Sequence, residues 1–399
     1  MKRFCIVTTS LAPTEAEAVR ELVARLQQRP GGTPVQGGLV YCTGHHDTEA
    51  LSAELTRALP GVPFVGATSC QGLGSSHGWM HGRRAVTALW LLGEGFRFGV
   101  ASLPKARAGE AVGRRLAERA LANAGIRTAR FALLHSTPGG EEELVTGLQA
   151  ALGRETVLLG GSAADEDLSG GWSVFSSESG ARTEGLVLAV CDWPGRIASS
   201  FRGGAMVTPF RGKVTAVQDR ALLEIDHRPA AEVYNEWLEG KLSKALEEGG
   251  SVLSETSLHP LGVFRGKSKE ASGYILVHPE AIVPREKSLL LFARVEEGEE
   301  VVLMSATRVG YAGRGASVAQ RALMEGGMPA SEVVGGLLIY CAGCMLTLQQ
   351  ETSEMLRAFS ESVAGAPFVS SFCFGEQGCA LPGRADHGNL MTGVLLLGT

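Results

Sequence analysis

The chain has 399 residues, a formal net charge of −5 and 44% hydrophobic residues. This length exceeds what one hydrophobic core usually supports, so we expect two domains. The composition is that of a folded globular protein and excludes a disordered chain. Lysines and arginines are scattered rather than clustered, which excludes a surface built for nucleic acid.

The N-terminal segment, MKRFCIVTTSLAP, has too short an apolar stretch for a secretion signal or a membrane span. The longest uncharged run, from Val333 to Leu348, contains several glycines and is shorter than the roughly 18 residues that a spanning helix needs. The sequence therefore predicts a cytoplasmic protein without a membrane partner. Its eight cysteines are then expected to be reduced thiols.

Two segments near opposite ends of the chain share one pattern. Residues 37–74 and 335–378 each begin with two glycines, continue through an apolar strand to Tyr-Cys-x-Gly, and reach Pro-Phe-Val after a helical stretch. Residues 131–165 follow the same plan more loosely. Self-similarity of this kind indicates one structural unit used three times.

The hydrophobic pattern predicts the elements of each unit in chain order. In the first unit, the strand FCIVTTS precedes a helix with a capping box from Thr14 to Glu17, and Asp47 is the expected N-cap of the next helix. In the second, FRFGVASL precedes a helix over 109–123, and in the third, EVVLMSATRVG precedes a helix over 316–324. A final apolar run, such as AVTALWLL or TGVLLLG, completes a β-α-β-α-β-β unit.

Strands that alternate with helices and are apolar throughout are typical of sheets covered by helices. We therefore predict an α/β fold of two domains, with mixed, largely parallel sheets built from repeated β-α-β-α-β-β units. The pattern changes near Asp226, where a turn precedes a helix that begins at Pro229. The predicted domains are residues 1–225 and 226–399, and the second is expected to contain a mixed sheet.

The order of several motifs resembles the FIST family. VGATSCQG, LLGGSAADED, LLEIDHRPAAEVY and FGEQG follow one another, and an Asp-His-Gly-Asn segment follows at residues 386–389. The resemblance extends over nearly the whole chain. It implies a FIST N-terminal domain and a FIST C-terminal domain that sense a small polar metabolite, such as an amino-acid-like one. The missing nucleophile, phosphate and dinucleotide motifs predict that this ligand is bound without catalysis. It also implies output through a separate signalling protein, such as a kinase or cyclase.

The third unit departs from the family pattern in two places. The resemblance puts an arginine after Cys-x-Gly where this chain has Cys344, and a Thr-Tyr pair where it has Cys373 and Phe374. If that arginine holds a ligand carboxylate in relatives, this chain is expected to prefer another ligand or to use another group.

The ligand site is expected at the carboxyl ends of the strands, where the glycine-rich turns lie. Turns of the first domain would face turns of the second across a cleft that closes over the ligand. Backbone amides would bind its anionic group, and Asp165 or Glu376 its cationic group. The predicted ligand-binding residues are Thr68, Ser69, Gly160, Gly161, Ser162, Asp165, Cys341, Cys344, Cys373 and Glu376.

The cysteines of the third unit leave an alternative open. Cys341 and Cys344 form a C-x-x-C motif, and with Cys373 and Cys379 they offer four thiols for zinc, an iron–sulfur cluster or redox chemistry. The second short spacing of a zinc site is missing. Cys341 also matches Cys42 of the first unit, which has no C-x-x-C, and this favours simple packing in the sheet. If the cysteines form a site, Cys344 at the start of a helix is expected to have a lowered pKa.

Two further alternatives remain. His45 or His46 could be the axial ligand of haem, because one branch of FIST-like proteins is associated with haem and nitric-oxide sensing. Local hydrogen bonding is the simpler role for both. A hydrolase-like enzyme is the other alternative, although the sequence has no G-x-S-x-G elbow, no phosphate-binding G-x-x-x-x-G-K-[ST] and no G-x-G-x-x-G after a strand. The main hypothesis needs no cofactor.

Overall fold

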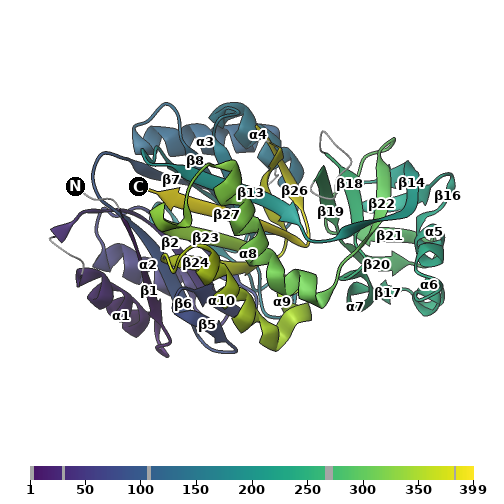
Figure 1. Cartoon of the computed structure of the whole chain (residues 1–399), viewed down its shortest axis with the longest axis horizontal. Helices are drawn as coiled ribbons and strands as arrows, with labels where there is room; N and C mark the ends of the chain where they lie inside the picture. The colour runs from purple at the N-terminus through teal and green to yellow at the C-terminus, as the bar shows by residue number, and fades with distance from the viewer. Residues whose placement is uncertain (1–3, 29–31, 106–108, 266–272, 382) are drawn as a thin grey trace.

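The computed structural model describes residues 4–28, 32–105, 109–265, 273–381 and 383–399. Within these ranges the strands form four sheets, and no helix is both long and apolar enough to cross a membrane. Figure 1 shows three of the sheets together in a large body and the fourth at the right-hand end. We call residues 4–203 and 306–399 the three-sheet body, and residues 206–305 the insert.

Each sheet of the three-sheet body contains the same run of four strands from one unit of the chain. The orders are β1-β6-β2-β3, β7-β12-β8-β9 and β13-β27-β23-β24. In each run the last two strands are parallel, and the other neighbours are antiparallel. The predicted α/β fold with mixed sheets is confirmed, and parallel pairing is confined to one pair in each of these sheets.

The first two units are continuous in sequence. The first consists of β1 (Phe4–Ser10), α1 (Glu15–Gln27), β2 (Val35–Thr43), α2 (Thr48–Ala58), β3 (Phe64–Ser69) and β6 (Val86–Leu92). The second consists of β7 (Phe98–Pro104), α3 (Glu110–Ala124), β8 (Phe131–Ser136), α4 (Glu141–Leu152), β9 (Val157–Ser162) and β12 (Gly185–Cys191). Helices α1 and α2 begin as predicted, because the side chains of Thr14 and Asp47 accept hydrogen bonds from N–H groups of the first turn.

The third unit is interrupted by the insert. It consists of β13 (Ile197–Gly203), α8 (Arg308–Glu325), η3 (Ala330–Glu332), β23 (Val333–Cys341), α9 (Ala342–Leu348), η4 (Gln349–Glu351), α10 (Thr352–Ser362), β24 (Phe368–Cys373) and β27 (Met391–Gly398). The prediction that EVVLMSATRVG supplies its first strand is wrong. That segment forms β22 (Glu300–Ser305) of the insert, while β13 pairs with β27. The chain leaves the unit after β13 and returns directly before α8, so nearness in sequence pointed to the wrong strand.

Helix α8 begins well before the predicted residue 316. Its first residue is Arg308, and the side chain of Thr307 accepts a hydrogen bond from Gly310 N at 3.0 Å. Gly310, Gly313 and Gly315 lower the helix propensity of the first two turns, which is why the sequence predicted a late start. Tertiary packing of α8 against α10 and β27 overrides that preference.

Each unit also carries a hairpin that joins the sheet of another unit. β4 (Gly72–Ser75) pairs with β24, β10 (Val174–Ser176) with β3, and β25 (Glu376–Leu381) with β9. The second strands of these hairpins are β5 (Gly78–His81), β11 (Gly180–Arg182) and β26 (Arg384–Gly388). The exchange links the three sheets in a cycle. The sequence analysis did not predict it, because such short strands have little local signal and their partners are distant in sequence.

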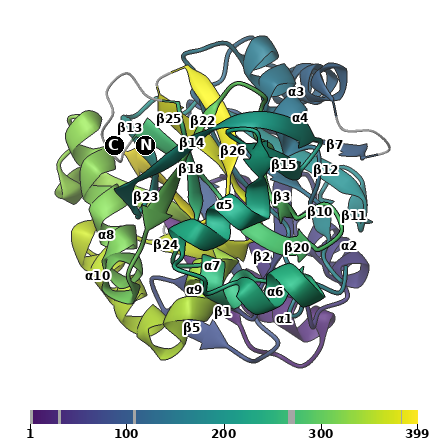
Figure 2. The same ribbon diagram turned by 90° about the vertical axis from the view of Figure 1, so that its right-hand side faces the viewer.

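The insert has its own hydrophobic core. It consists of β14 (Met206–Gln218), β15 (Ala221–Ile225), β16 (Arg228–Pro229), α5 (Ala230–Trp237), α6 (Ser243–Glu248), β17 (Gly250–Ser251), α7 (Leu253–Thr256), β18 (Leu261–Phe264), β19 (Tyr274–Val277), β20 (Pro279–Val283), β21 (Ser288–Leu291) and β22. The predicted boundary after residue 225 falls between β15 and β16. Figure 2 views the molecule from this end, with α5 and α6 in front.

Candidate functional site

The carboxyl ends of β3, β9 and β24 meet in the middle of the three-sheet body. Cys70 N donates a hydrogen bond to Phe372 O at 3.0 Å, and Ala164 N donates to Thr68 O at 3.0 Å. Phe374 N donates to Ser162 O at 3.1 Å. Each strand end is therefore bonded to the next, and turns of all three units lie around one point.

The last paired residues of the parallel strands differ among the three units. These pairs are Thr43 with Ser69, Ser136 with Ser162, and Cys341 with Cys373. The third unit therefore has thiols where the other two have hydroxyl groups.

The predicted hydroxyl residues of the first two units are engaged in internal hydrogen bonds. Ser69 Oγ donates to Gly72 O at 2.7 Å and accepts from Phe372 N at 2.8 Å. Thr68 Oγ1 accepts from Ser173 N at 3.0 Å, and Ser162 Oγ donates to the buried carboxylate of Glu141 at 2.8 Å. These hydrogen bonds connect the strand ends to the neighbouring hairpins. This structural role is sufficient to explain why Thr68, Ser69 and Ser162 are buried.

Asp165 and the two predicted glycines also make internal contacts. The Asp165 carboxylate accepts from three backbone groups, the N–H of Leu168 at 2.7 Å, of Gly170 at 2.7 Å and of Gly171 at 2.8 Å. These hydrogen bonds fix the loop over residues 168–171 to the Asp165 carboxylate. Gly160 and Gly161 lie within β9, beside β25.

A cavity of about 560 Å³ lies between these strand ends and the insert. The three-sheet body contributes Cys70, Glu166, Asp167, Leu168, Arg308, Cys341, Gly343, Leu346, Thr347, Gln349, Cys373, Phe374, Gly375 and Asn389 to its lining. The insert contributes Leu253, Ser254, Ser257, Leu258, His278 and Phe292. Of the predicted ligand-binding residues, Cys341 and Cys373 line the cavity.

A buried arginine lies behind the cavity wall. Arg314 of α8 is 3% exposed, and its Nη2 lies 2.8 Å from Cys344 Sγ. Its Nη1 donates to Leu390 O at 2.7 Å, and its guanidinium lies 4.6 Å from the ring centroid of Tyr311 and 5.1 Å from that of Tyr340. The cation that the family pattern puts at position 344 is therefore supplied here by another helix.

This cation is one of the groups that lower the pKa of Cys344. Burial opposes ionisation of Cys344, but the hydrogen bond with Cys341 and the charge of Arg314 outweigh burial and lower the Cys344 pKa. Burial raises the pKa of Cys341, and its contact with Cys344 raises it further. The predicted lowering of the Cys344 pKa thus has Arg314 among its causes.

Glu376 completes this buried group. Burial and the neighbouring Cys341 raise the pKa of its carboxyl well above the ordinary value, although Glu376 Oε2 accepts a hydrogen bond from Met391 N at 2.9 Å. Its Oε1 is buried, and no hydrogen-bond partner for it is found among the described residues. The arrangement therefore lowers the pKa of the Cys344 thiol and raises that of the neighbouring Glu376 carboxyl.

The predicted four-thiol set is not brought together. Cys379 lies on β25 and packs against the core of α3 and α4, where its Sγ is 3.8 Å from Leu158 O. Cys341, Cys344 and Cys373 belong to the core of the three-sheet body. Among the described residues, no group of three or more histidine, cysteine, aspartate and glutamate side chains is arranged to hold a metal ion.

The two histidines considered for haem lie outside the cavity lining. His45 Nδ1 is 3.3 Å from Glu166 Oε1, and His46 Nδ1 is 3.4 Å from Glu15 Oε1. Burial, followed by the charge of Arg84, lowers the pKa of His46. Each imidazole therefore lies near a carboxylate, but among the described residues both ring nitrogens of His46 are buried without a hydrogen-bond partner, so the expected local hydrogen bonding is not found at His46.

The cavity contains residues that the sequence analysis did not single out. His278 of the insert is 5% exposed, its Nε2 lies 3.0 Å from Thr256 Oγ1, and burial lowers its pKa to about 3. Asn389 Oδ1 accepts a hydrogen bond from His278 N at 3.3 Å. The Asp-His-Gly-Asn motif gave a signal for Asn389, whereas GYILVH gave no sign that its histidine faces another domain.

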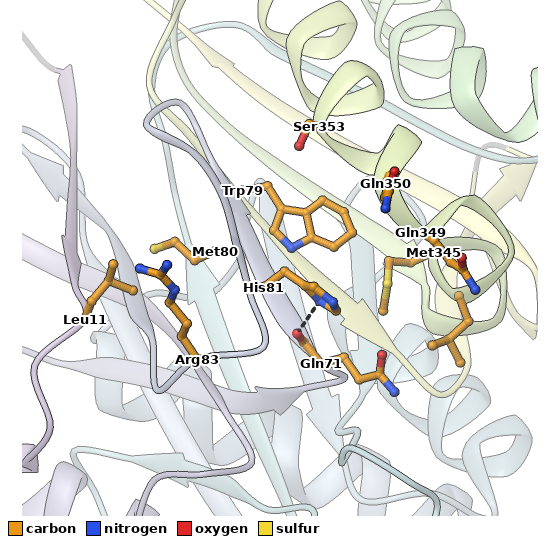
Figure 3. Close-up of a pocket in the computed structure, with 11 residues that line it drawn as sticks. Leu11, Gln71, Trp79, Met80, His81, Arg83, Met345, Gln349, Gln350 and Ser353 are labelled. Carbon is orange, nitrogen blue, oxygen red and sulfur yellow. Dashed lines mark hydrogen bonds between the residues drawn. The ribbon is translucent and has the colours of Figure 1, made fainter.

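A second hollow adjoins the cavity. It has a volume of about 720 Å³ and shares Leu346 and Gln349 with the cavity lining. Figure 3 shows Trp79 and His81 of the β4–β5 hairpin facing Met345 and Gln349 across this hollow.

Comparison with known proteins divides the chain near residue 229, which lies inside the insert. The FIST N domain matches residues 36–228, and the FIST C domain matches residues 230–379. Among solved structures, the chain is similar to cyanuric acid hydrolase from A. caulinodans, with 11% identity, a TM-score of 0.40 and 100% of both chains covered. A second cyanuric acid hydrolase structure has 12% identity, a TM-score of 0.32 and 100% coverage of both chains. No curated protein matches the sequence. The two domain matches, which together extend over most of the chain, show that it belongs to the FIST family.

Proposed function

We propose that this chain is a sensory protein that binds a small metabolite, without converting it, in the cavity between the three-sheet body and the insert. Membership of the FIST family supports the sensory role. The observation that carries the proposal is the origin of the lining, because all three units and the insert contribute side chains to one cavity. A molecule bound there would contact the three-sheet body and the insert at the same time.

The lining favours a ligand with an apolar part and charged ends. Leu253, Leu258, Phe292, Leu346 and Phe374 supply apolar surface, and the volume lies in the range of small-molecule pockets. An amino acid with an apolar side chain has this chemistry.

Charged side chains of both signs are available for the ends of such a ligand. Arg308 is suited to a carboxylate, since its side chain is 50% exposed and its ion pair with Glu351 is 3.3 Å long. Glu166 and Asp167 are suited to an ammonium group. They replace Asp165 and Glu376 in this role, because neither Asp165 nor Glu376 is among the residues that line the cavity.

The connections of the insert suit a movement that reports binding. The chain passes between the three-sheet body and the insert in two short segments, residues 204–205 between β13 and β14 and residues 306–307 between β22 and α8. Ion pairs bridge the two bodies, including Arg220 with Glu141 at 2.7 Å. We propose that the ligand draws the insert toward the body and that a separate signalling protein, such as a kinase or cyclase, detects the closed form.

A thermal-shift screen of amino acids and related small metabolites tests the proposal. A true ligand present at about 100 times its Kd should stabilise the protein by about 2.7 kcal/mol. Mass spectrometry of the ligand after prolonged incubation checks the second part, since conversion to a product would show that the cavity is catalytic. A visible absorption band of the purified protein would support the haem alternative instead.

A further inference from the structure

We propose that Cys341 and Cys344 form a redox-active dithiol, which a hydroperoxide entering the cavity oxidises to an intramolecular disulfide. The reaction shares the cavity with the proposed metabolite but does not require it. Either proposal can therefore fail while the other stands.

The charge around Arg314 is the first argument. A guanidinium that is 3% exposed requires a counter-charge, because an unpaired buried charge is strongly destabilising. The described structure shows no carboxylate ion pair for Arg314, and its closest acidic atom is Cys344 Sγ at 2.8 Å. The aromatic faces of Tyr311 and Tyr340 add attraction but no negative charge. A thiolate at Cys344 satisfies the arginine.

The positions of the two sulfurs are the second argument. Cys341 lines the cavity and is 5% exposed, whereas Cys344 is fully buried behind it. Cys341 is the N-cap residue of α9 and Cys344 lies in the first turn of that helix, so the two side chains are three residues apart on neighbouring positions of one helical turn. The two cysteines therefore act differently, because Cys341 meets a small solute and Cys344 attacks Cys341 from behind.

The chemistry balances with the hydroperoxide as the only oxidant. The Cys341 thiol passes its proton to the Cys344 thiolate and attacks the terminal peroxide oxygen, so that an S–O bond forms and the O–O bond breaks. The departing alkoxide, or hydroxide from hydrogen peroxide, takes the proton back from Cys344. The Cys344 thiolate then attacks the Cys341 sulfenic acid, forming the S–S bond and releasing hydroxide, which gains a proton from solvent. Two thiols are oxidised and one peroxide is reduced.

Peptide mapping of the wild-type protein after hydrogen peroxide treatment is the direct test. If solvent exposure alone determined which thiol reacts, Cys379 would be oxidised first, because it is the one cysteine that is not buried. The dithiol predicts a Cys341–Cys344 disulfide while Cys379 remains reduced. Oxidation of Cys379 alone, or a disulfide between Cys341 and Cys373, would overturn the assignment.

Variants separate the two roles. Cys344→Ser should stop disulfide formation and leave a Cys341 sulfenic acid that dimedone traps, whereas the matched control Cys379→Ser should leave the disulfide unchanged. Arg314→Gln should slow oxidation at least tenfold at neutral pH, and Arg321→Gln, on the exposed side of the same helix, should not.

If Arg314→Gln fails to fold, the pH profile of the wild-type oxidation rate tests the role of Arg314 instead. The titratable and charged groups that face Cys344 are Arg314, Tyr311, Tyr340, Cys341 and Glu376. Because the Cys344 pKa is lowered, the oxidation rate should approach its plateau below pH 9.0, the ordinary pKa of a cysteine thiol. A rate that keeps rising through pH 9.0 would contradict the proposal.

Discussion

The sulfur of Cys373 fills the space beside Gly161, so that a Cβ at residue 161 would lie 2.3 Å from Cys373 Sγ. This contact joins the ends of β9 and β24, which belong to different units and, in the family division, to different domains. Because of this contact, residue 161 at the centre of the candidate site has room for glycine but not for a larger residue.

Gly161→Ala should therefore destabilise the protein by about 1–3 kcal/mol, because the buried sulfur has little room to move. The measurement is the free energy of unfolding in urea. Gly313→Ala is the matched control, since nothing lies within 4 Å of the added Cβ on helix α8, and it should be neutral or stabilise by about 0.5–1 kcal/mol. Adding Cys373→Ala to Gly161→Ala should recover part of the loss. Equal stability of the two single variants would show that the strand ends are not tightly packed.

Arg308 is expected to hold the carboxylate of the ligand. Arg308→Gln should weaken binding of a carboxylate ligand at least tenfold, since a charge-assisted hydrogen bond is worth about 1.5–3 kcal/mol. Titration calorimetry measures this effect. Arg357→Gln is the control, because Arg357 also forms an exposed ion pair, with Glu361 at 2.7 Å, on the neighbouring helix α10. Unchanged affinity in Arg308→Gln, with the stability preserved, would place the carboxylate elsewhere.

His278 should make the protein sensitive to acid. Burial lowers its pKa from 6.5 to about 3, so the unfolded chain binds a proton that the folded protein excludes between these values. Stability should then fall with decreasing pH from about 6.5 toward 3, by up to about 1.4 kcal/mol per pH unit from this residue.

His278→Gln should remove this contribution, so that the variant loses less stability than the wild type as the pH falls. Urea unfolding across this pH range measures the difference, with exposed His227→Gln as the control. Parallel pH curves for His278→Gln and the wild type would mean that the His278 imidazole accepts a proton in the folded state.

The sequence predicted the parts of the fold that depend on local pattern. The caps at Thr14 and Asp47 and the strands that end at Thr43 and Cys341 have a strong local signal, because side-chain oxygens and apolar runs act over a few residues. The pairing of Cys341 with Cys373 also follows from the repeated strand–helix–strand pattern.

The cavity depended on long-range contacts that the sequence did not reveal. Arg314 was not predicted as a site residue, because three glycines lower the helix propensity at the start of α8 and the sequence therefore placed Arg314 before the helix. The register of that helix determines where the guanidinium lies. His278 was missed because it comes from the insert, whose position over the strand ends depends on packing. Asp165 was chosen for its charge, but three backbone amides already bind that charge.

Hydrogen–deuterium exchange with and without the stabilising metabolite tests the central claim most directly. The account predicts slower exchange in two distant stretches of sequence, residues 253–258 of the insert and residues 341–349 of the three-sheet body, because both line the same cavity. Residues 54–58 of α2 lie outside the cavity lining and should be unaffected. Protection confined to one body, or found only around Trp79 in the adjoining hollow, would contradict binding between the two bodies.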